Sequence, residues 1–283
     1  MTKLVFLPHR TVIRISGPDG VKFLKGLCTA HIETLAAEAQ QRSAPRLHYG
    51  AFLRPQGKMI GDALLHMPAP DDIRVDVPAG IRDELVAKLN VYKLRAQVTI
   101  EALDVPAFAA FDGPLPDGFL EDSRGDVIGD AFGFSYGPQT ANATLDDWDD
   151  WRMAHGLSDP GRDFGPDQLY AIDANLDLLE AVDFHKGCYV GQELTSRMKR
   201  RGQIKNRILP FRYDTHAPEA NAEILNGNLR AGEVLATADG IGLALMRLDR
   251  LDGELGDSFG RVSLAIPKWL APYAMPPVAK DAL

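Results

Sequence analysis

Short β-forming runs, separated by turn residues, make up the chain after Asn206 and constrain the fold more than any other feature. The runs lie at residues 208–213, 232–237, 242–248 and 261–266, with glycine, aspartate and asparagine between them. Runs of this length and spacing are typical of small antiparallel barrels and sandwiches. The sequence therefore predicts a small C-terminal β-barrel or β-sandwich.

The chain before Asn206 alternates β-forming runs with helical patterns. In chain order, the predicted elements are strands at 4–7 and 11–15, a helix at 21–28, a hairpin of strands at 48–53 and 59–67, a strand at 73–77, a helix at 81–94 and a strand at 97–102. We expect residues 106–118, which are rich in proline and glycine, to form a connection between layers. This mixture of strands and helices predicts an α+β fold.

Charge and cysteine content exclude several classes of protein. The 283-residue chain has a formal net charge of −8, which argues against broad attraction to nucleic acid or to anionic membranes. Its two cysteines, Cys28 and Cys188, lie far apart and form no CxxC pair, which excludes a disulfide framework and a self-sufficient four-thiolate metal site. We recognise no secretory signal, presequence or long apolar run. We therefore expect a cytoplasmic protein that does not associate with membranes.

An acidic run, Asp-Asp-Trp-Asp-Asp at residues 146–150, precedes apolar residues at helical spacing. Carboxylates in the first turn of a helix are stabilised by the positive end of the helix dipole, so the run predicts a helix start. Metal binding by the same carboxylates is the alternative. We prefer the helix start, because it accounts for these residues without a bound ion.

The segment around Cys188 is the most informative about chemistry. Gly187 and Gly191 flank the thiol and allow the backbone to approach a ligand closely. A helical pattern begins at Gln192, so Cys188 is expected just ahead of a helix N-terminus, which stabilises a thiolate. Lys186, two residues before the thiol, adds positive potential. Together these features predict a reactive cysteine.

Alternatives remain open for this segment. Free cysteine is among the most buried residue types, so Cys188 could be structural, and that interpretation is preferred for Cys28 in the apolar stripe of a predicted helix. His185 could join Cys188 as a metal ligand, although such a histidine is more often a hydrogen-bonding residue. The basic stretch at 197–207 could attract an acidic ligand or partner, or form a solvated helix face. It contains no aromatic residues, so direct nucleic-acid binding is not expected.

The string Lys-Gly-Cys-Tyr-Val-Gly-Gln-Glu at residues 186–193 resembles the motif of the YgfZ family, whose mitochondrial relatives help to mature 4Fe-4S proteins. The resemblance extends over most of the chain. Further matching segments lie at residues 16–19, 23–26, 54–58, 92–95 and 175–176.

The resemblance implies an architecture and a ligand. It implies a T-protein-like folate-binding body at residues 1–204, with two interleaved subdomains around a central cavity and an inserted α+β unit near 48–105. A small C-terminal β-barrel is expected at residues 205–283. Tetrahydrofolate or a derivative is the implied cofactor, and iron-sulfur carrier or client proteins are the implied partners.

The resemblance also assigns roles to individual residues. Cys188 and Lys186 of the motif become the candidate catalytic residues. The candidate folate-binding residues are Asp62, Arg152, Asp173, Tyr189, Gln192 and Glu193. We expect neither metal ligands nor a permanently bound iron-sulfur cluster, because such clusters usually take several thiolates and this chain has two distant ones.

The chain departs from the glycine-cleavage T-protein, an aminomethyltransferase, at positions that matter for its reaction. The T-protein pattern Gly-Gly-Ile-x-Asp-Asp corresponds to residues 57–62, which keep only the second carboxylate, Asp62. A pterin-holding glutamate is replaced by Ala154, and Pro-x-Glu is replaced by Ala-Ile-Asp at 171–173. The sequence therefore favours an assembly factor for 4Fe-4S enzymes, without conventional turnover, over a folate-dependent one-carbon transferase linked to tRNA modification.

Overall fold

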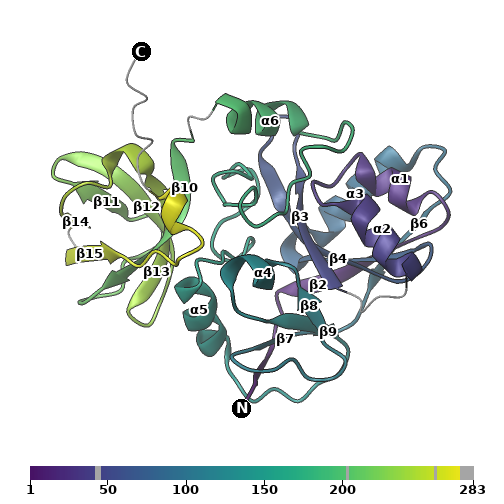
Figure 1. Cartoon of the computed structure of the whole chain (residues 1–283), viewed down its shortest axis with the longest axis horizontal. Helices are drawn as coiled ribbons and strands as arrows, with labels where there is room; N and C mark the ends of the chain where they lie inside the picture. Colours follow the sequence, from purple (N-terminus) through teal and green to yellow (C-terminus); the bar gives the residue numbers. More distant parts are fainter. Residues whose placement is uncertain (42–45, 202–203, 258–259, 275–283) are drawn as a thin grey trace.

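The computed structural model describes residues 1–41, 46–201, 204–257 and 260–274. Within these ranges the chain forms a body around a nine-stranded sheet and, beside it, a closed β-barrel (Figure 1). Residues 202–203 of the basic stretch, and residues 275–283 at the end of the predicted C-terminal domain, lie outside the described residues. The mixed helices and strands confirm the predicted α+β class.

The nine strands of the body are ordered β1-β7-β9-β8-β3-β4-β5-β2-β6. All neighbouring pairs are antiparallel except β3 with β8. The strands are β1 (Lys3–Phe6), β2 (Arg10–Ser16), β3 (Arg46–Leu53), β4 (Met59–Ala69), β5 (Asp72–Pro78), β6 (Thr99–Leu103), β7 (Ala107–Phe111), β8 (Leu120–Asp122) and β9 (Gly133–Tyr136).

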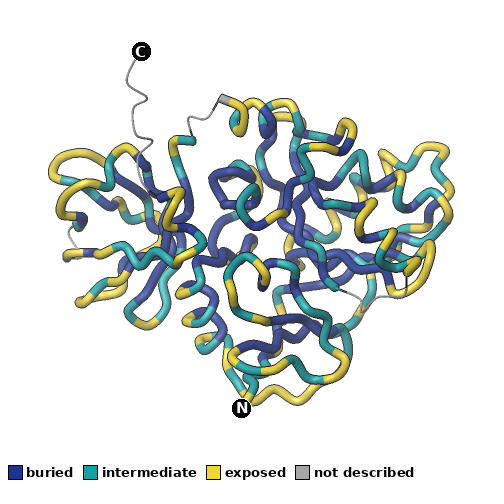
Figure 2. The backbone as a smooth tube through the Cα atoms, viewed as in Figure 1, coloured by how far each residue is buried: buried dark blue, intermediate teal, exposed yellow. Residues whose placement is uncertain are grey.

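Two hydrophobic clusters lie against the strands of this body. One contains Leu24, Ile13 and Leu85 and lies under the helices; the other contains Trp148 and Phe132. Buried backbone runs through the strands of both parts, while exposed residues lie mostly on outer loops and helices (Figure 2). The helices are α1 (Gly20–Lys25), α2 (Ile32–Gln41), α3 (Arg82–Lys93), α4 (Arg124–Ile128), α5 (Leu145–Ala154) and α6 (Gln192–Arg201).

The predicted connection at 106–118 is wrong in its first part, because it contains strand β7. Every residue of β7 is buried, and the strand pairs with β1 on one side and β9 on the other. The sequence of a strand that is buried on both faces is a continuous apolar run, without the alternation of apolar and polar residues that marks a half-exposed strand. The flanking prolines, Pro106 and Pro114, mark its ends and concealed it in the sequence.

The structure corrects the position of Cys28 but confirms its structural character. Helix α1 ends at Lys25, so Cys28 lies after the helix, where it forms a β-bridge with Phe52. Its side chain is fully buried. Burial raises the pKa of the Cys28 thiol, which disfavours the thiolate.

The acidic run forms the predicted helix start. Thr144 caps α5, and its hydroxyl accepts a hydrogen bond from the Asp147 N–H while the Asp147 carboxylate accepts one from the Thr144 N–H. Such a reciprocal capping box satisfies two backbone donors of the first turn. The Asp149 carboxylate instead accepts a hydrogen bond from Arg152 in the next turn.

The C-terminal part is a closed barrel, which confirms the first of the two predicted folds, a β-barrel or a β-sandwich. Its six strands are ordered β10-β13-β12-β11-β14-β15. They are β10 (Asn206–Tyr213), β11 (Glu223–Asn226), β12 (Leu229–Ala238), β13 (Ile241–Arg247), β14 (Leu255–Asp257) and β15 (Gly260–Leu264).

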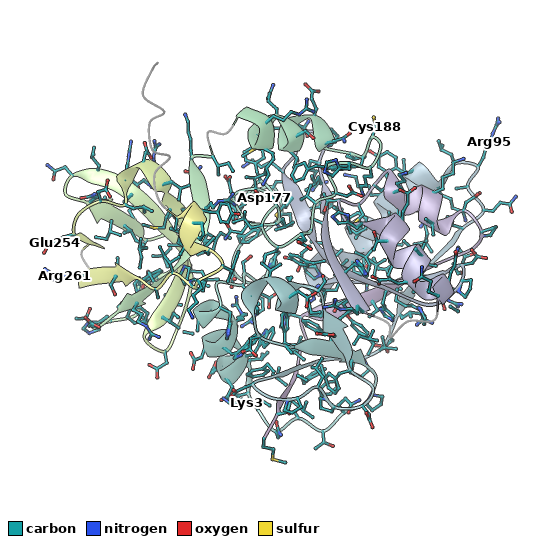
Figure 3. The ribbon with its side chains drawn as sticks, in the orientation of Figure 1. Lys3, Arg95, Asp177, Cys188, Glu254 and Arg261 are labelled. Carbon is teal, nitrogen blue, oxygen red and sulfur yellow. The ribbon has the colours of Figure 1, made fainter. Side chains whose placement is uncertain are left out.

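A buried carboxylate, Asp177, joins the barrel to the body. Its side chain is inaccessible to solvent and pairs with Arg207 of β10 at 2.9 Å and with Lys199 of α6 at 2.9 Å. Figure 3 shows Asp177 in the interior, between the two parts. The amide of Asn175 also donates to the carbonyl oxygen of Ile208 in β10. The barrel and α6 are therefore tied to the same short segment of the body.

Candidate functional site

The loop that carries Cys188 is anchored from below by Lys186. The Lys186 ammonium donates hydrogen bonds to the carbonyl oxygens of Cys28 and Ala30, the second at 2.8 Å. The Asp183 carboxylate accepts the Lys186 backbone N–H at 3.0 Å and so closes the turn before it. These bonds hold the loop against the segment that follows α1.

This geometry gives Lys186 a different role from the predicted one. The side chain is buried, and its ammonium lies over the ring of Tyr189, 5.0 Å from the ring centroid. Burial lowers the pKa of Lys186. Because the ammonium is committed to two carbonyl groups, Lys186 is a positioning residue for the loop instead of the thiolate-stabilising neighbour of Cys188.

Gly191 turns the loop into helix α6. Its φ of +84° lies in the left-handed region, and a Cβ there would approach the Arg54 carbonyl oxygen to 2.7 Å. Only glycine fits this position without strain. Helix α6 begins at Gln192, as predicted, and Cys188 lies ahead of its first turn.

Cys188 is exposed and lines an open cleft, and Figure 3 shows it at the upper edge of the molecule. The cleft has a volume of about 840 Å³. It brings together four of the predicted site residues, which are near one another in sequence, and adds residues from the β3–β4 turn, from α3 and from the rest of α6. The lining residues are Pro55, Tyr92, Cys188, Tyr189, Val190, Gly191, Gln192, Glu193, Ser196, Arg197 and Arg200.

The basic stretch divides between this cleft and the interior. Arg197 and Arg200 line the cleft, whereas Lys199 and Arg207 bind Asp177. Neither Arg197 nor Arg200 forms a hydrogen bond or ion pair with any residue that the structure describes. The cleft therefore contains two guanidinium groups that are available to a ligand.

A second group of predicted residues lies elsewhere, in a buried charged cluster. Asp62, on β4, accepts a hydrogen bond from Arg10 at 2.9 Å. Arg10 also donates to Asp76 at 2.8 Å, and Asp159 lies 3.8 Å from it. Burial raises the pKa of Asp62 to about 6, against the opposing effect of the Arg10 charge. The carboxylate expected to hold folate thus already has a protein partner.

Arg152 is the other predicted residue of this cluster. Both of its terminal nitrogens donate to Asp163 at 2.7 Å, and its Nε donates to Asp149 at 2.6 Å. The cavity between Arg152 and Asp62 has a volume of about 20 Å³, whereas small-molecule sites usually measure roughly 300–1,000 Å³. In this conformation the residues of the expected central cavity do not fit a pterin.

Asp173 belongs to neither site. It is buried beside the barrel, and its backbone carbonyl accepts the Ile208 N–H at 2.8 Å. Burial raises the pKa of its carboxyl group to about 6. The predicted folate-binding residues are therefore distributed over three places in the fold.

Sequence reasoning missed residues at both sites. Arg10 donates hydrogen bonds to both Asp62 and Asp76, which lie on two other strands of the sheet, and nothing in the local sequence indicates this. At the cleft the missed residue is Tyr92, which comes from α3, whereas Arg197 and Arg200 belong to the basic stretch that was expected to attract an acidic ligand or partner.

The described residues contain no group of three or more His, Cys, Asp and Glu side chains that could hold a metal ion. Among the described helices, none is long and apolar enough to cross a membrane.

Comparison with known proteins identifies relatives of both parts. Residues 205–272 match the family model described as the CAF17 C-terminal β-barrel domain. A protein of Mycosarcoma maydis, named as a mitochondrial homologue of the iron-sulfur cluster assembly factor IBA57, is 31% identical over 75% of this chain, which spans 57% of that protein. The human mitochondrial IBA57 assembly factor is 27% identical over 93% of this chain and 84% of its own length.

The fold resembles that of an aminomethyltransferase. The crystal structure of glycine-cleavage aminomethyltransferase T from Bartonella henselae superposes with a TM-score of 0.73, covering 94% of this chain and 84% of that chain at 17% identity. This likeness confirms the predicted T-protein-like fold with an added barrel. It concerns the fold alone.

The same comparisons bear on the predicted location of the protein and on its predicted family. The prediction of a cytoplasmic protein is wrong on this comparison, since these relatives are named as mitochondrial proteins. These relatives are named as iron-sulfur cluster assembly factors of the IBA57 type, and this chain has a T-protein-like fold. Membership of the YgfZ family itself stays a prediction.

Proposed function

Because its homologues are iron-sulfur cluster assembly factors and its barrel matches the CAF17 C-terminal domain, we propose that this chain assists the maturation or repair of 4Fe-4S enzymes through Cys188. The observation that carries the proposal is the contrast between the two cysteines. Cys188 is exposed in an open cleft, whereas Cys28 is buried. The chain thus offers one accessible thiol in a site large enough for a ligand.

One accessible thiol defines what the site does chemically. Iron-sulfur clusters are usually held by several thiolates, so Cys188 contributes one ligand to a cluster that other thiols also bind. Lys186 and Gly191 hold the loop so that Cys188 faces the cleft. The cluster is cargo that passes between this chain and an iron-sulfur carrier or client protein.

The proposal is tested in cells that lack the native gene. Cys188→Ala should yield a folded protein that fails to restore the activity of a 4Fe-4S enzyme, because the accessible ligand is lost. His185→Ala, on the same loop, is the matched control and also tests whether the imidazole joins the thiol. Its side chain is exposed and its ring forms no hydrogen bond, ion pair or ring stack with the described residues, so we expect full restoration. Full restoration by Cys188→Ala would refute the proposed role.

Tetrahydrofolate is a further proposed ligand, supported by the sequence resemblance alone. Because the central cluster is closed, binding there requires Arg10 to leave Asp62, and we derive no chemical step through folate. A thermal-shift titration tests the proposal. A rise in melting temperature that is lost in Asp62→Asn would support folate binding at the central cluster. No rise at saturating tetrahydrofolate would refute folate as a ligand of this chain.

A one-carbon transferase is the competing function. It requires a carboxylate that is free to act on the folate, yet Asp62 is paired and Ala154 replaces the expected glutamate. The observed contacts therefore favour the assembly factor.

A further inference from the structure

The proposed function leaves a deficit of thiols. Cys188 is the accessible one of the chain's two cysteines, and clusters usually take several thiolates. The remaining thiols must come from outside the chain. The cleft around Cys188 shows which chemistry they can bring.

Three charged side chains line the same side of α6. Glu193, Arg197 and Arg200 are separated by four and three residues, which places them on one face of the helix. None of the three is paired with another side chain in the part of the chain that the structure describes. Glu193 and Arg197 have the spacing of a helical ion pair, yet they do not form one. The cleft thus presents two free cations and one free anion beside a thiol.

These groups complement a small zwitterionic peptide. A guanidinium group recognises a carboxylate through paired hydrogen bonds, and a carboxylate recognises an ammonium group. Resting on the function proposed above, we propose that the cleft binds reduced glutathione. Its two carboxylates lie on Arg197 and Arg200, its ammonium group lies on Glu193, and its thiol shares the cleft with Cys188.

The size of the cleft agrees with this ligand. Its volume of about 840 Å³ falls within the range of small-molecule sites. An extended tripeptide spans about 10 Å. The apolar wall formed by Pro55 and by the half-exposed ring of Tyr92 can cover the peptide backbone.

The cleft carries both positive and negative side chains, and this favours a free tripeptide over an acidic segment of a protein partner as its ligand. An acidic segment would pair with the arginines but would leave Glu193 facing like charge. Glutathione carries both signs of charge, and so it satisfies all three side chains.

Binding is tested by calorimetry on the full chain, without iron, under nitrogen and with a phosphine reductant that prevents disulfides. We expect reduced glutathione to bind, and Arg197→Gln/Arg200→Gln to weaken binding at least tenfold. The control, Arg95→Gln/Arg212→Gln, removes the same total charge from exposed arginines that do not line the cleft. Arg95 lies far from Cys188 in Figure 3. This control should bind as the wild type does. S-methylglutathione should also bind equally, because the carboxylates carry the affinity.

Three results would overturn the inference: no binding at millimolar glutathione, equal affinity of the two double variants for glutathione, or loss of binding when the thiol is methylated. None of them affects the proposed function, which stands or falls with the cellular test of Cys188→Ala. An acidic segment as the true occupant would appear as no glutathione binding in the wild type, together with binding of an acidic peptide that is lost in the Arg197→Gln/Arg200→Gln variant.

Discussion

Replacing Lys186 by methionine should loosen the loop that carries Cys188. The substitution keeps the length of the apolar stem and removes only the ammonium group. The carbonyl oxygens of Cys28 and Ala30 then lose their charged donor. The contact of the ammonium with the ring of Tyr189, which lines the cleft, is lost as well, so the effect measures all the contacts by which Lys186 anchors the loop.

The magnitude follows from these two bonds. A hydrogen bond to a charged group contributes about 1.5–3 kcal/mol, so two would contribute about 3–6 kcal/mol. The cost of removing the ammonium group from water opposes these two hydrogen bonds. The lowered pKa of Lys186 reflects this cost. We expect a net loss of about 2 kcal/mol in the free energy of opening the loop, which corresponds to about a 30-fold change in the opening equilibrium.

The buried thiol of Cys28 provides the assay. It lies directly under Lys186 and reacts with a thiol reagent only when this region opens. In native buffer, Lys186→Met should raise the rate of Cys28 modification about 30-fold. Lys25→Met is the control, since Lys25 pairs with Glu33 at the surface and exposed pairs contribute at most about 1 kcal/mol. Equal Cys28 rates in the two variants would refute the anchoring role.

Three further predictions test other parts of the structure. Gly191→Ala should destabilise the protein by more than about 1 kcal/mol, because it combines a positive φ with a steric clash; Gly187→Ala, where a Cβ meets no atom within 4 Å, should leave the melting temperature nearly unchanged. Native protein should consume one equivalent of iodoacetamide, at Cys188, and two equivalents in denaturant; rapid loss of both thiols in native buffer would contradict the observed burial. Asp173 has its pKa raised from 3.8 to about 6, so its contribution to stability is present below pH 3.8 and is lost as the pH rises through 6. Asp173→Asn should therefore gain stability relative to the wild type between pH 4.5 and pH 7, by up to about 3 kcal/mol, and an unchanged difference in denaturation midpoints would show that the carboxyl group is not perturbed.

Features encoded over short stretches were predictable from the sequence. The barrel strands follow from β-forming runs between turn residues, and the start of α6 at Gln192 follows from local periodicity. The four predicted site residues of the cleft, which are Cys188, Tyr189, Gln192 and Glu193, lie together because they are near one another in the chain. Tyr92 reaches the same cleft from α3, and only the fold brings it there.

Pairings between distant residues could not be predicted in this way. Arg10 meets Asp62 and Asp76 because β2, β4 and β5 adjoin in the sheet. A carboxylate in a short motif looks the same whether it is free or paired. The assignment of Asp62 to folate followed the motif, whereas its contact with Arg10 depends on the order of the strands.

The buried carboxylate of Asp177 bears on how this chain can be divided. A truncation before Arg207 would remove one of its two cations and leave the charge with a single lysine from α6. Breaking a buried ion pair on one side typically costs about 3–5 kcal/mol. The same cut would strip Ile208 and Leu243 from the core of the body. Two parts that look like separate modules are therefore one thermodynamic unit, and the barrel could be exchanged between relatives only together with the segment that holds Asp177.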